Sequence, residues 1–259
     1  MRDFLDRYFA YIPDGSPEQT GLLSVGHLGW MAVVIAACVV VPLVFRHTSQ
    51  RAKNIFLYTV AGILLVNEGM RTYWLFRTGE AKFQNVAPLD LCGFMIYLTI
   101  VTIFVRKRFL MNICYAIAFT GPVFGVLTPS INQYPWWGFN YVHGMVGHGL
   151  ICLVALFFIV AEGFRPELKY VPRILGIVVA VALVVIAPLD YFFDANWFYL
   201  RSAPAGTPLE IYEEWVGWPW YFALILATAA VLWTLLYLPF VRRKAHQRSS
   251  EPEEESQMP

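Results

Sequence analysis

The sequence predicts an all-α membrane protein, a polytopic bundle of seven transmembrane helices with the N-terminus outside and the C-terminus in the cytoplasm. Three observations predict this fold class. Of the 259 residues, 58% are hydrophobic and only 14% are charged, compared with about a quarter charged in a soluble domain. Seven apolar runs are long enough to cross a bilayer, and basic residues cluster in alternate loops. This composition excludes a disordered chain, a nucleic-acid binder and an ordinary cytosolic enzyme.

The predicted spanning helices follow from the length of the apolar runs. A spanning helix needs about 20 mainly apolar residues to cross about 30 Å of hydrocarbon. The runs that meet this requirement are 22–45, 54–76, 87–105, 109–128, 141–161, 171–190 and 219–241. Gly121 and Pro122 interrupt the fourth run. We expect Pro122 to kink this helix rather than end it, because neighbouring groups can satisfy the freed backbone atoms.

The distribution of lysine and arginine predicts the orientation, because these residues favour cytoplasmic loops. The loops after the first, third and fifth runs carry three basic residues each, and the segment after residue 241 carries four. The opposite side carries five, namely Arg2, Arg7, Arg77, Lys82 and Arg201. The more basic side is therefore predicted to be cytoplasmic, and an odd number of spans follows from the alternation of the clusters.

Two segments flank the predicted transmembrane domain, which comprises residues 22–241. In segment 1–21, apolar residues recur at helical spacing between charged ones, which is typical of a short helix lying in the outer interface. A frayed terminus is the alternative. Asp3 and Asp6 argue against a secretory signal. Segment 242–259 is almost free of apolar residues and is predicted to be a disordered cytoplasmic tail.

The cysteine and histidine positions predict neither a disulfide framework nor a metal site. All four cysteines, Cys38, Cys92, Cys114 and Cys152, fall inside predicted spans. His143 and His148 would lie about 140° apart around a helix, which makes them a poor chelating pair. The sequence contains no glycine-rich phosphate loop and no His-Glu-x-x-His motif, so we expect no cofactor.

Polar residues within the predicted spans gather in the outer halves. At 1.5 Å of rise per residue, Cys92 lies about 8 Å deep, His148 about 10 Å and Glu68 about 12 Å. The other members of this layer are Asn67, Arg71, Asp90, His27, His143 and Asp190. Ionisable residues at membrane depth are costly unless paired or hydrated, so the layer predicts a hydrated cavity that opens outward. Alternatively, helix ends are simply polar, and Glu68 with Arg71 forms a structural ion pair.

Within this layer, Cys92 and His148 are the strongest candidates for a catalytic pair. They come from different predicted helices at similar depth, near the level of glycerolipid ester bonds. A thiol becomes a strong nucleophile when a histidine takes its proton, and the thiolate can then accept an acyl group from an ester. Asp90 would orient or acidify the pair. The alternative for Cys92 is a small buried apolar residue.

Four short motifs carry a resemblance to a known family. They are APLDLCGF from Ala87 to Phe94, GHGLI from Gly147 to Ile151, Asn196 with Tyr199 and Leu200, and GWPWY from Gly217 to Tyr221. The chain resembles the YwaF-like bacterial integral membrane proteins, which are related to transmembrane protein 164. Asp90 stands where the bacterial pattern has histidine, and Leu89 follows the proline where the animal relative has its nucleophile.

The resemblance implies a multipass helical protein and, from the animal relative, cysteine-dependent transfer of fatty acyl chains between phospholipids. It also implies that His148, Asn196 and the segment around Trp220 are site positions. The leading hypothesis is therefore a cell-membrane acyltransferase or esterase acting on lipid acyl esters from the outer leaflet. Its catalytic residues would be Cys92, His148 and Asp90, and its substrate-binding residues would be Asn67, Glu68, Arg71, His143, Asn196 and Trp220.

The expected partners are membrane lipids, through both head group and acyl chain, and no nucleic acid. A planar guanidinium such as that of Arg71 matches phosphate geometry. An alternative from another class is a transporter or small-ligand binding protein that uses the same outward cavity without covalent chemistry. A scaffold protein is a third hypothesis, favoured if that region is packed solid. The lipid, the choice between hydrolysis and transfer, and the oligomeric state are left open by the sequence.

Overall fold

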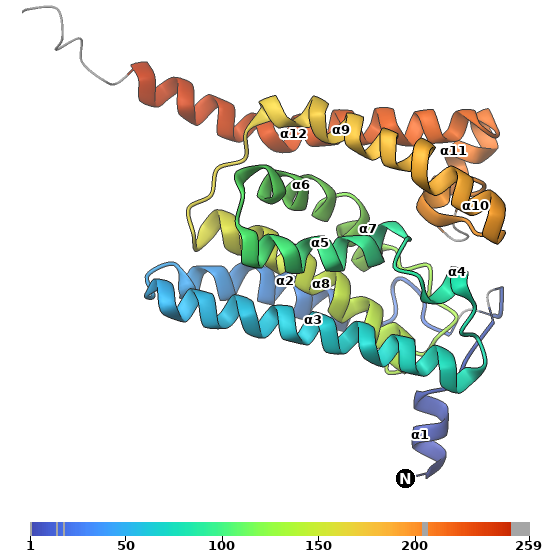
Figure 1. Cartoon of the computed structure of the whole chain (residues 1–259). Coiled ribbons are helices and arrows are strands. Elements are labelled where there is room, and N and C mark those ends of the chain that lie inside the picture. Colours follow the sequence, from blue (N-terminus) through green and yellow to red (C-terminus); the bar gives the residue numbers. More distant parts are fainter. Residues whose placement is uncertain (1, 14, 18, 204–206, 250–259) are drawn as a thin grey trace, which may run out of the picture.

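The computed structural model describes residues 2–13, 15–17, 19–203 and 207–249, with the backbone alone described for 242–249. Its helices in chain order (Figure 1) are α1 (Arg2–Tyr8), α2 (Val25–Phe45), α3 (Gln50–Thr78), α4 (Phe83–Val86), α5 (Leu91–Val105), α6 (Arg108–Ala118), α7 (Gly121–Leu127), α8 (Phe139–Val160), η1 (Leu168–Tyr170), α9 (Val171–Ala180), η2 (Val181–Ile186), α10 (Ala187–Phe193), η3 (Trp197–Tyr199), α11 (Leu209–Val216) and α12 (Trp220–Ser249).

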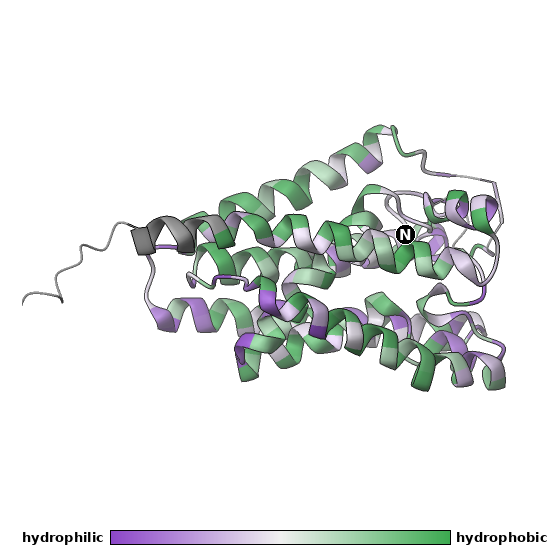
Figure 2. Ribbon diagram, turned by 90° about the horizontal axis from the view of Figure 1, so that it is seen from above, coloured by the Kyte–Doolittle hydropathy of each residue, from purple (hydrophilic) through white to green (hydrophobic). Residues whose placement is uncertain are grey.

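The long helices form a bundle in which successive rods run in opposite directions (Figure 1). α2, α3, α5 and α8 lie together, and α6 with α7 packs against α5 and α8. The rod made of α9, η2 and α10 lies beside α12 on the side of the bundle away from α3. Hydrophobic residues line most of the length of these helices, and hydrophilic residues are more frequent toward their ends and in loops (Figure 2).

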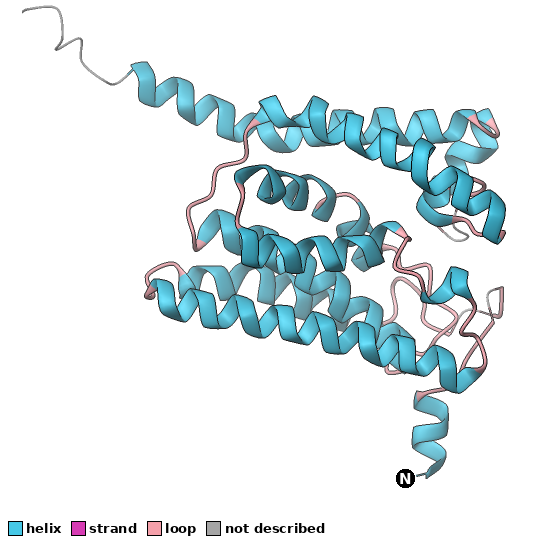
Figure 3. Ribbon diagram, viewed as in Figure 1, coloured by secondary structure: helices cyan, strands magenta, loops and turns pink. Residues whose placement is uncertain are grey.

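Helices are the only regular secondary structure in the described part of the chain, which contains no strand (Figure 3). Five stretches are long and apolar enough to cross a membrane: Val25–Phe45, Arg108–Leu127, Phe139–Val160, Leu168–Phe193 and Trp220–Val241. The 15 residues of α5 reach only about 22 Å at 1.5 Å per residue, and α3 carries polar residues near its predicted outer end. The all-α membrane fold is confirmed, whereas seven spans and the orientation stay predictions.

The fourth predicted span is broken rather than kinked. α6 ends at Ala118, and α7 begins at Gly121. Between them Phe119 has φ of −89° and ψ of 6°, which lies outside α-helical geometry. Pro122 lies in the first turn of α7, where its missing N–H would have had no partner within the helix. The expected kink at Pro122 is therefore corrected to a break that precedes it. The break gives α7 its own N-terminus, packed beside the first turn of α5.

Two further helices differ from the predicted ranges. The sixth rod is continuous from 171 to 193 but passes through a π-helical segment, η2, just before Pro188. Proline has no N–H and clashes with the preceding turn, which favours a local change of helix type. α12 continues to Ser249 and so includes the first residues of segment 242–259, which is predicted to be a disordered tail. Residues 250–259 of that predicted tail lie outside the described residues.

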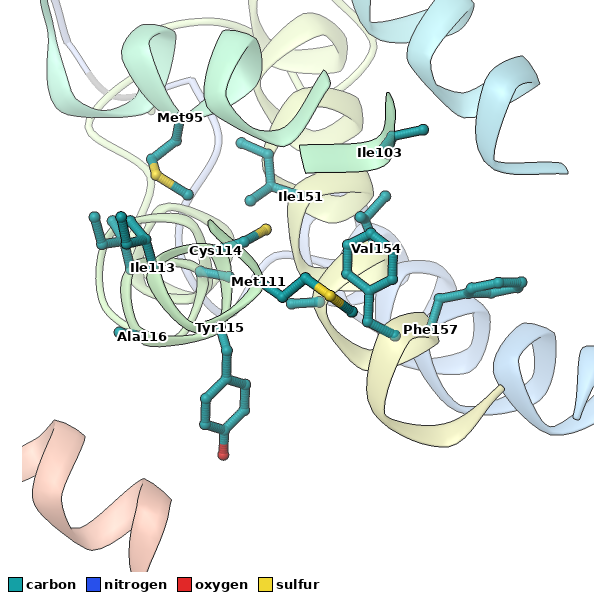
Figure 4. Packing of buried hydrophobic residues seen from close by; sticks show 14 of the residues in the cluster. Met95, Ile103, Met111, Ile113, Cys114, Tyr115, Ala116, Ile151, Val154 and Phe157 are labelled. Atoms are coloured by element: carbon teal, nitrogen blue, oxygen red, sulfur yellow. The ribbon is translucent and has the colours of Figure 1, made fainter. Parts of the chain in front are cut away.

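The core of the bundle lies where α5, α6 and α8 meet (Figure 4). Met95 of α5, Cys114 of α6, and Ile151 and Phe157 of α8 are fully buried there. Tyr115 of α6 reaches outward from this cluster, and its hydroxyl donates to a backbone carbonyl of α12 at 3.0 Å. Close packing of side chains from three helices leaves little freedom in their relative rotation. The core thereby positions the predicted outer ends of α5 and α8.

At the opposite ends of α5 and α8, polar side chains form a network of hydrogen bonds. Arg106 ends α5 in the left-handed region, with φ of 50°, and its Nη1 donates to Glu162 Oε1 at 2.8 Å. Its Nη2 donates to Asn54 Oδ1 at 2.8 Å, and Lys53 Nζ donates to the carbonyl of Ala161 at 2.5 Å. These contacts join α3, α5 and α8 at the end that the basic residues predict to be cytoplasmic.

Candidate functional site

A polar cluster around the buried Glu68 joins α3 to α8 near their predicted outer ends. The Glu68 carboxylate is 5% exposed, and its Oε1 lies 3.1 Å from His143 Nε2. Arg71 Nη1 lies 3.9 Å from the other Glu68 oxygen, and Arg71 Nη2 donates to the carbonyl of Asn85 at 2.8 Å. Asn67 Nδ2 donates to the His143 carbonyl at 3.3 Å. Four predicted substrate-binding residues therefore lie together, each with protein contacts that stabilise the fold.

We expect Glu68→Ala to destabilise the folded protein by about 1–3 kcal/mol, because it leaves the half-buried Arg71 and His143 side chains without their carboxylate partner. Glu68→Gln retains an oxygen for His143 and should cost less. The measurement is thermal or denaturant unfolding of purified protein in one detergent. Glu80→Ala is the matched control, since the pair that Glu80 forms with Lys82 at 3.6 Å lies at the surface and contributes about 0–1 kcal/mol. Equal unfolding curves for Glu68→Ala and Glu80→Ala would contradict this structural role.

Cys92 differs from the other cysteines in both exposure and partners. The remaining three are buried, and each thiol has a polar neighbour: Cys38 with the Gly149 carbonyl at 3.9 Å, Cys114 with Thr99 Oγ1 at 3.7 Å and Cys152 with the Ala118 carbonyl at 3.6 Å. Cys92 is half-buried, and within the described residues its thiol forms no hydrogen bond. A thiol that holds no structural hydrogen bond is free to react, although its reactivity also requires access for the substrate.

Asp90 positions Cys92 by capping α5. Its backbone is extended, and its Oδ2 accepts a hydrogen bond from the N–H of Gly93 at 2.8 Å, which is the geometry of a helix N-cap. Cys92 is consequently the second residue of α5. Unpaired N–H groups of a first helical turn favour negative charge nearby, as on a thiolate. The structure therefore gives the predicted catalytic residue Asp90 a capping contact. Its expected acidifying role is corrected, because a carboxylate close to Cys92 disfavours the thiolate.

The side chains of Cys92 and His148 lie against two glycines on one face of α7. A Cβ at Gly121 would lie 3.8 Å from Cys92 Sγ, and a Cβ at Gly125 would lie 2.6 Å from both Nδ1 and Cε1 of His148. Residues four apart share a helix face, with their Cβ positions about 5–6 Å apart. The thiol and the imidazole thus lie along the same face of α7, about one turn apart. No hydrogen bond joins Cys92 to His148 in the described chain.

The imidazole of His148 contains an unsatisfied nitrogen. Its Nδ1 is buried and has no hydrogen-bond partner among the described residues. A buried polar atom left in this state costs about 1–3 kcal/mol relative to a satisfied one. His27 shares this property at Nε2, but its Nδ1 lies 2.7 Å from the hydroxyl of Tyr141. His27 and His148 thus each have a buried nitrogen without a described partner, and His148 is the one that lies against the α7 face that also contacts Cys92.

Asn196 and Trp220 lie in different surroundings from the buried cluster. Asn196 Oδ1 accepts the N–H of Arg201 at 2.9 Å, and its Nδ2 donates to the Ser202 carbonyl at 2.9 Å. These bonds shape the loop between α10 and α11. Trp220 begins α12 and is 68% exposed. Large amphipathic rings are favoured at membrane interfaces, so its exposure is compatible with a contact to lipid.

Tyr199 is a site neighbour that the residue patterns alone did not single out. Burial raises the pKa of Tyr199, and the negative charges of Asp90 and of Cys92 as thiolate raise it further. Tyr199 therefore lies within electrostatic reach of both residues. Its place in the aromatic loop motif was visible in the sequence, but its proximity to α5 depends on how that loop folds back.

Within the described residues, neither a metal-binding cluster nor either of two surface hollows lies at the polar layer. No group of three or more His, Cys, Asp or Glu residues within the described ranges lies close enough together to hold a metal ion. Two surface hollows lie elsewhere, one lined by Asp3, Phe4, Arg7 and Trp137 and the other by Ala230, Val231, Thr234 and Leu235. The outward cavity therefore stays a prediction.

Comparison with known proteins identifies one family. The family model described as the TMEM164 family matches residues 22–237, which covers most of the chain and all the predicted site residues. No curated protein and no solved structure matches the sequence. The match agrees with the relationship to transmembrane protein 164 expected from the four motifs, while the narrower YwaF-like assignment stays a prediction.

Proposed function

Because the chain belongs to the TMEM164 family, we propose that this multipass membrane protein is an acyltransferase or esterase acting on acyl esters of membrane lipids. Cys92 is the proposed nucleophile and His148 the proposed general base. One observation carries the proposal. Within the described chain, Cys92 of α5 and His148 of α8 lie against adjacent turns of the same face of α7. Cys92 is half-buried and its thiol has no hydrogen-bond partner, and the imidazole of His148 has an unsatisfied nitrogen. The family resemblance read from the sequence implies the same chemistry.

The proposed reaction begins when the side chains of Cys92 and His148 approach each other to within hydrogen-bonding distance. Catalytic groups often reach this distance only with substrate bound. His148 accepts the thiol proton, and the Cys92 thiolate attacks the carbonyl carbon of a lipid ester. The carbonyl π electrons move to oxygen and form a tetrahedral oxyanion. When the intermediate collapses, the bond to the alkoxide oxygen breaks, and the imidazolium returns the proton to that leaving oxygen. The acyl group remains on Cys92 as a thioester.

The second half of the proposed reaction regenerates the thiol. His148 removes a proton from the hydroxyl of a second lipid or from water, and the resulting oxygen nucleophile attacks the thioester carbonyl. The carbon–sulfur bond then breaks, and the thiolate recovers the proton from His148. Transfer and hydrolysis thus differ only in the acceptor. The chemistry needs no oxidant, reductant or further co-reactant.

Lipid binding is proposed to involve the cluster on α3 and the exposed aromatic at the start of α12. The Arg71 side chain is 22% exposed and uses Nη2 for Asn85, which leaves further N–H groups for a phosphate. Glu68, His143 and Asn67 would hold Arg71 in place, and Trp220 would contact the interface. Asp90 and Asn196 would act through the local structure that they hold.

A covalent intermediate tests the proposed function. Purified protein in nanodiscs of phosphatidylcholine and phosphatidylglycerol is supplied with phospholipid labelled in the acyl chain, quenched in acid, digested and analysed by mass spectrometry. We expect a labelled acyl group on the peptide that contains Cys92, removable by neutral hydroxylamine as a thioester should be. Label on a different residue, or no label during measured turnover, would refute the assignment of Cys92. Solute accumulation in vesicles without any acyl product would favour the transporter hypothesis instead.

A further inference from the structure

The loop between α10 and α11 contains two consecutive residues in an unfavourable backbone conformation. Phe198 has φ of 56° and Tyr199 has φ of 55°, and both are bulky aromatic residues rather than glycine. A non-glycine residue in this region costs about 1–3 kcal/mol and persists only when its surroundings impose it. Such strain is concentrated at functional sites, which makes this loop a candidate part of the site.

Hydrogen bonds from three directions impose this conformation. The N–H of Trp197 donates to Asp190 Oδ1 at 2.7 Å, and Trp197 Nε1 donates to the carbonyl of Gln84 at 3.1 Å. On the other side of the strained pair, Trp218 Nε1 donates to the Leu200 carbonyl at 3.1 Å. The Tyr221 hydroxyl donates to the carbonyl of Tyr199 itself. The backbone of Tyr199 is therefore held by α10, by the segment before α5 and by α12.

The held segment lies against the beginning of α5. Leu89 packs against the buried cluster that contains Trp197, and the rings of Phe83 and Trp197 are in edge contact with centroids 6.0 Å apart. Asp90 and Cys92 follow Leu89 directly along the chain. The phenol of Tyr199 forms no hydrogen bond with any described residue, and a phenol is protonated at neutral pH. It is thus a donor without a described partner, on a segment that packs against Leu89 just before Asp90 and Cys92, and the charges of Asp90 and a Cys92 thiolate act on it.

We propose that Tyr199 is a further catalytic residue whose hydroxyl donates a hydrogen bond to the oxyanion formed when Cys92 attacks a lipid ester. This inference rests on the proposed function. The phenol keeps its proton throughout, while electrons move from the carbonyl π bond to oxygen and back as the intermediate forms and collapses. A donor held in place before reaction stabilises developing charge more than it stabilises the neutral ester. The strained loop supplies that fixed position.

The test compares Tyr199→Phe with Tyr191→Phe in nanodiscs containing the labelled phospholipid. Tyr191 lies on α10 and is 83% exposed, which makes it a matched control for loss of a phenolic hydroxyl. We expect Tyr199→Phe to lower kcat about 100- to 1000-fold, as loss of one oxyanion donor does, with KM changed by less than about threefold. The rate of Cys92 alkylation by iodoacetamide should be unchanged, because the nucleophile itself is intact. Tyr191→Phe should match the unsubstituted protein.

A second variant guards against a folding defect in Tyr199→Phe. Tyr221→Phe removes the hydrogen bond to the Tyr199 carbonyl but retains the phenol, so kcat should fall by about tenfold, the equivalent of one ordinary hydrogen bond. If Tyr199→Phe folds and its kcat is within threefold of that of the unsubstituted protein, the role of Tyr199 is overturned while the proposed function stands. If Tyr199→Phe does not fold, a kcat of Tyr221→Phe within threefold of the unsubstituted protein has the same meaning. Absence of turnover and of acyl-Cys92 in the unsubstituted protein overturns the proposed function and this inference together.

Discussion

Replacement of Cys92 by alanine is expected to lower lipid acyl turnover by at least about 10³-fold, because removing a nucleophile eliminates the covalent route. Alanine at Cys38, Cys114 or Cys152 should leave turnover within about threefold, since these thiols contact backbone carbonyls or Thr99 inside the core. The four variants form a matched series in which only the position of the lost thiol differs. Cys92→Ser retains a weaker nucleophile and should lie between Cys92→Ala and the unsubstituted protein.

The readout for this series is release or transfer of labelled acyl chains in nanodiscs at a temperature well below unfolding. Thermal unfolding of each variant is measured alongside, because small cavities in the core cost stability. A folded Cys92→Ala protein that keeps a tenth or more of its turnover would remove Cys92 from the mechanism. A comparable loss in Cys38→Ala, Cys114→Ala or Cys152→Ala would mean that packing rather than chemistry explains the effect.

Gly125→Ala is expected to lower turnover by at least about 100-fold even though it adds a single methyl group remote in sequence from both catalytic residues. The added Cβ would lie 2.6 Å from His148 Nδ1 and Cε1, which is closer than side chains tolerate. The imidazole must therefore leave the face of α7 that it shares with Cys92, and a displacement of about 1 Å costs about 10²-fold in rate. The accompanying overpacking should cost about 1–3 kcal/mol of stability.

Three glycine variants serve as controls for this prediction. A Cβ at Gly62 or Gly176 meets nothing within 4 Å, so alanine there should keep turnover and stabilise its helix slightly. A Cβ at Gly121 would lie 3.8 Å from Cys92 Sγ, an ordinary contact, so Gly121→Ala should have a mild effect. Full turnover in Gly125→Ala, with His148→Gln inactive, would show that the position of the imidazole against α7 is not required.

The helices were predictable where apolar length and local signals agreed. α2 and α8 end at or next to the predicted residues, because each is a long apolar run bounded by polar residues. The break between α6 and α7 was not predictable from Pro122, since proline tolerates both a kinked helix and the first turn of a new one. The choice between the two depends on what packs around Thr120 and Gly121, which a local pattern does not contain.

The candidate site was predictable as a set of residues but not as an arrangement. Asn67, Glu68 and His143 were expected in the same outer polar layer, and the structure joins them through hydrogen bonds between α3 and α8. Asn196 was expected at the site from its motif, yet its side chain is engaged within its own loop. Tyr199 belongs to the same motif, and its relation to Cys92 arises from contacts made by residues as distant as Gln84 and Tyr221.

The sequence by itself determined that this chain is a multipass α-helical membrane protein of a recognisable family. Hydrocarbon admits few charges and requires backbone hydrogen bonds to be satisfied within each helix, so composition and run length decide the class. Only the tertiary structure decided that Cys92 and His148 face the same side of α7, and that Tyr199 is held beside α5. Such contacts between residues distant in sequence depend on the rotation of each helix and on how the loops fold back. Both are determined by packing rather than by local sequence.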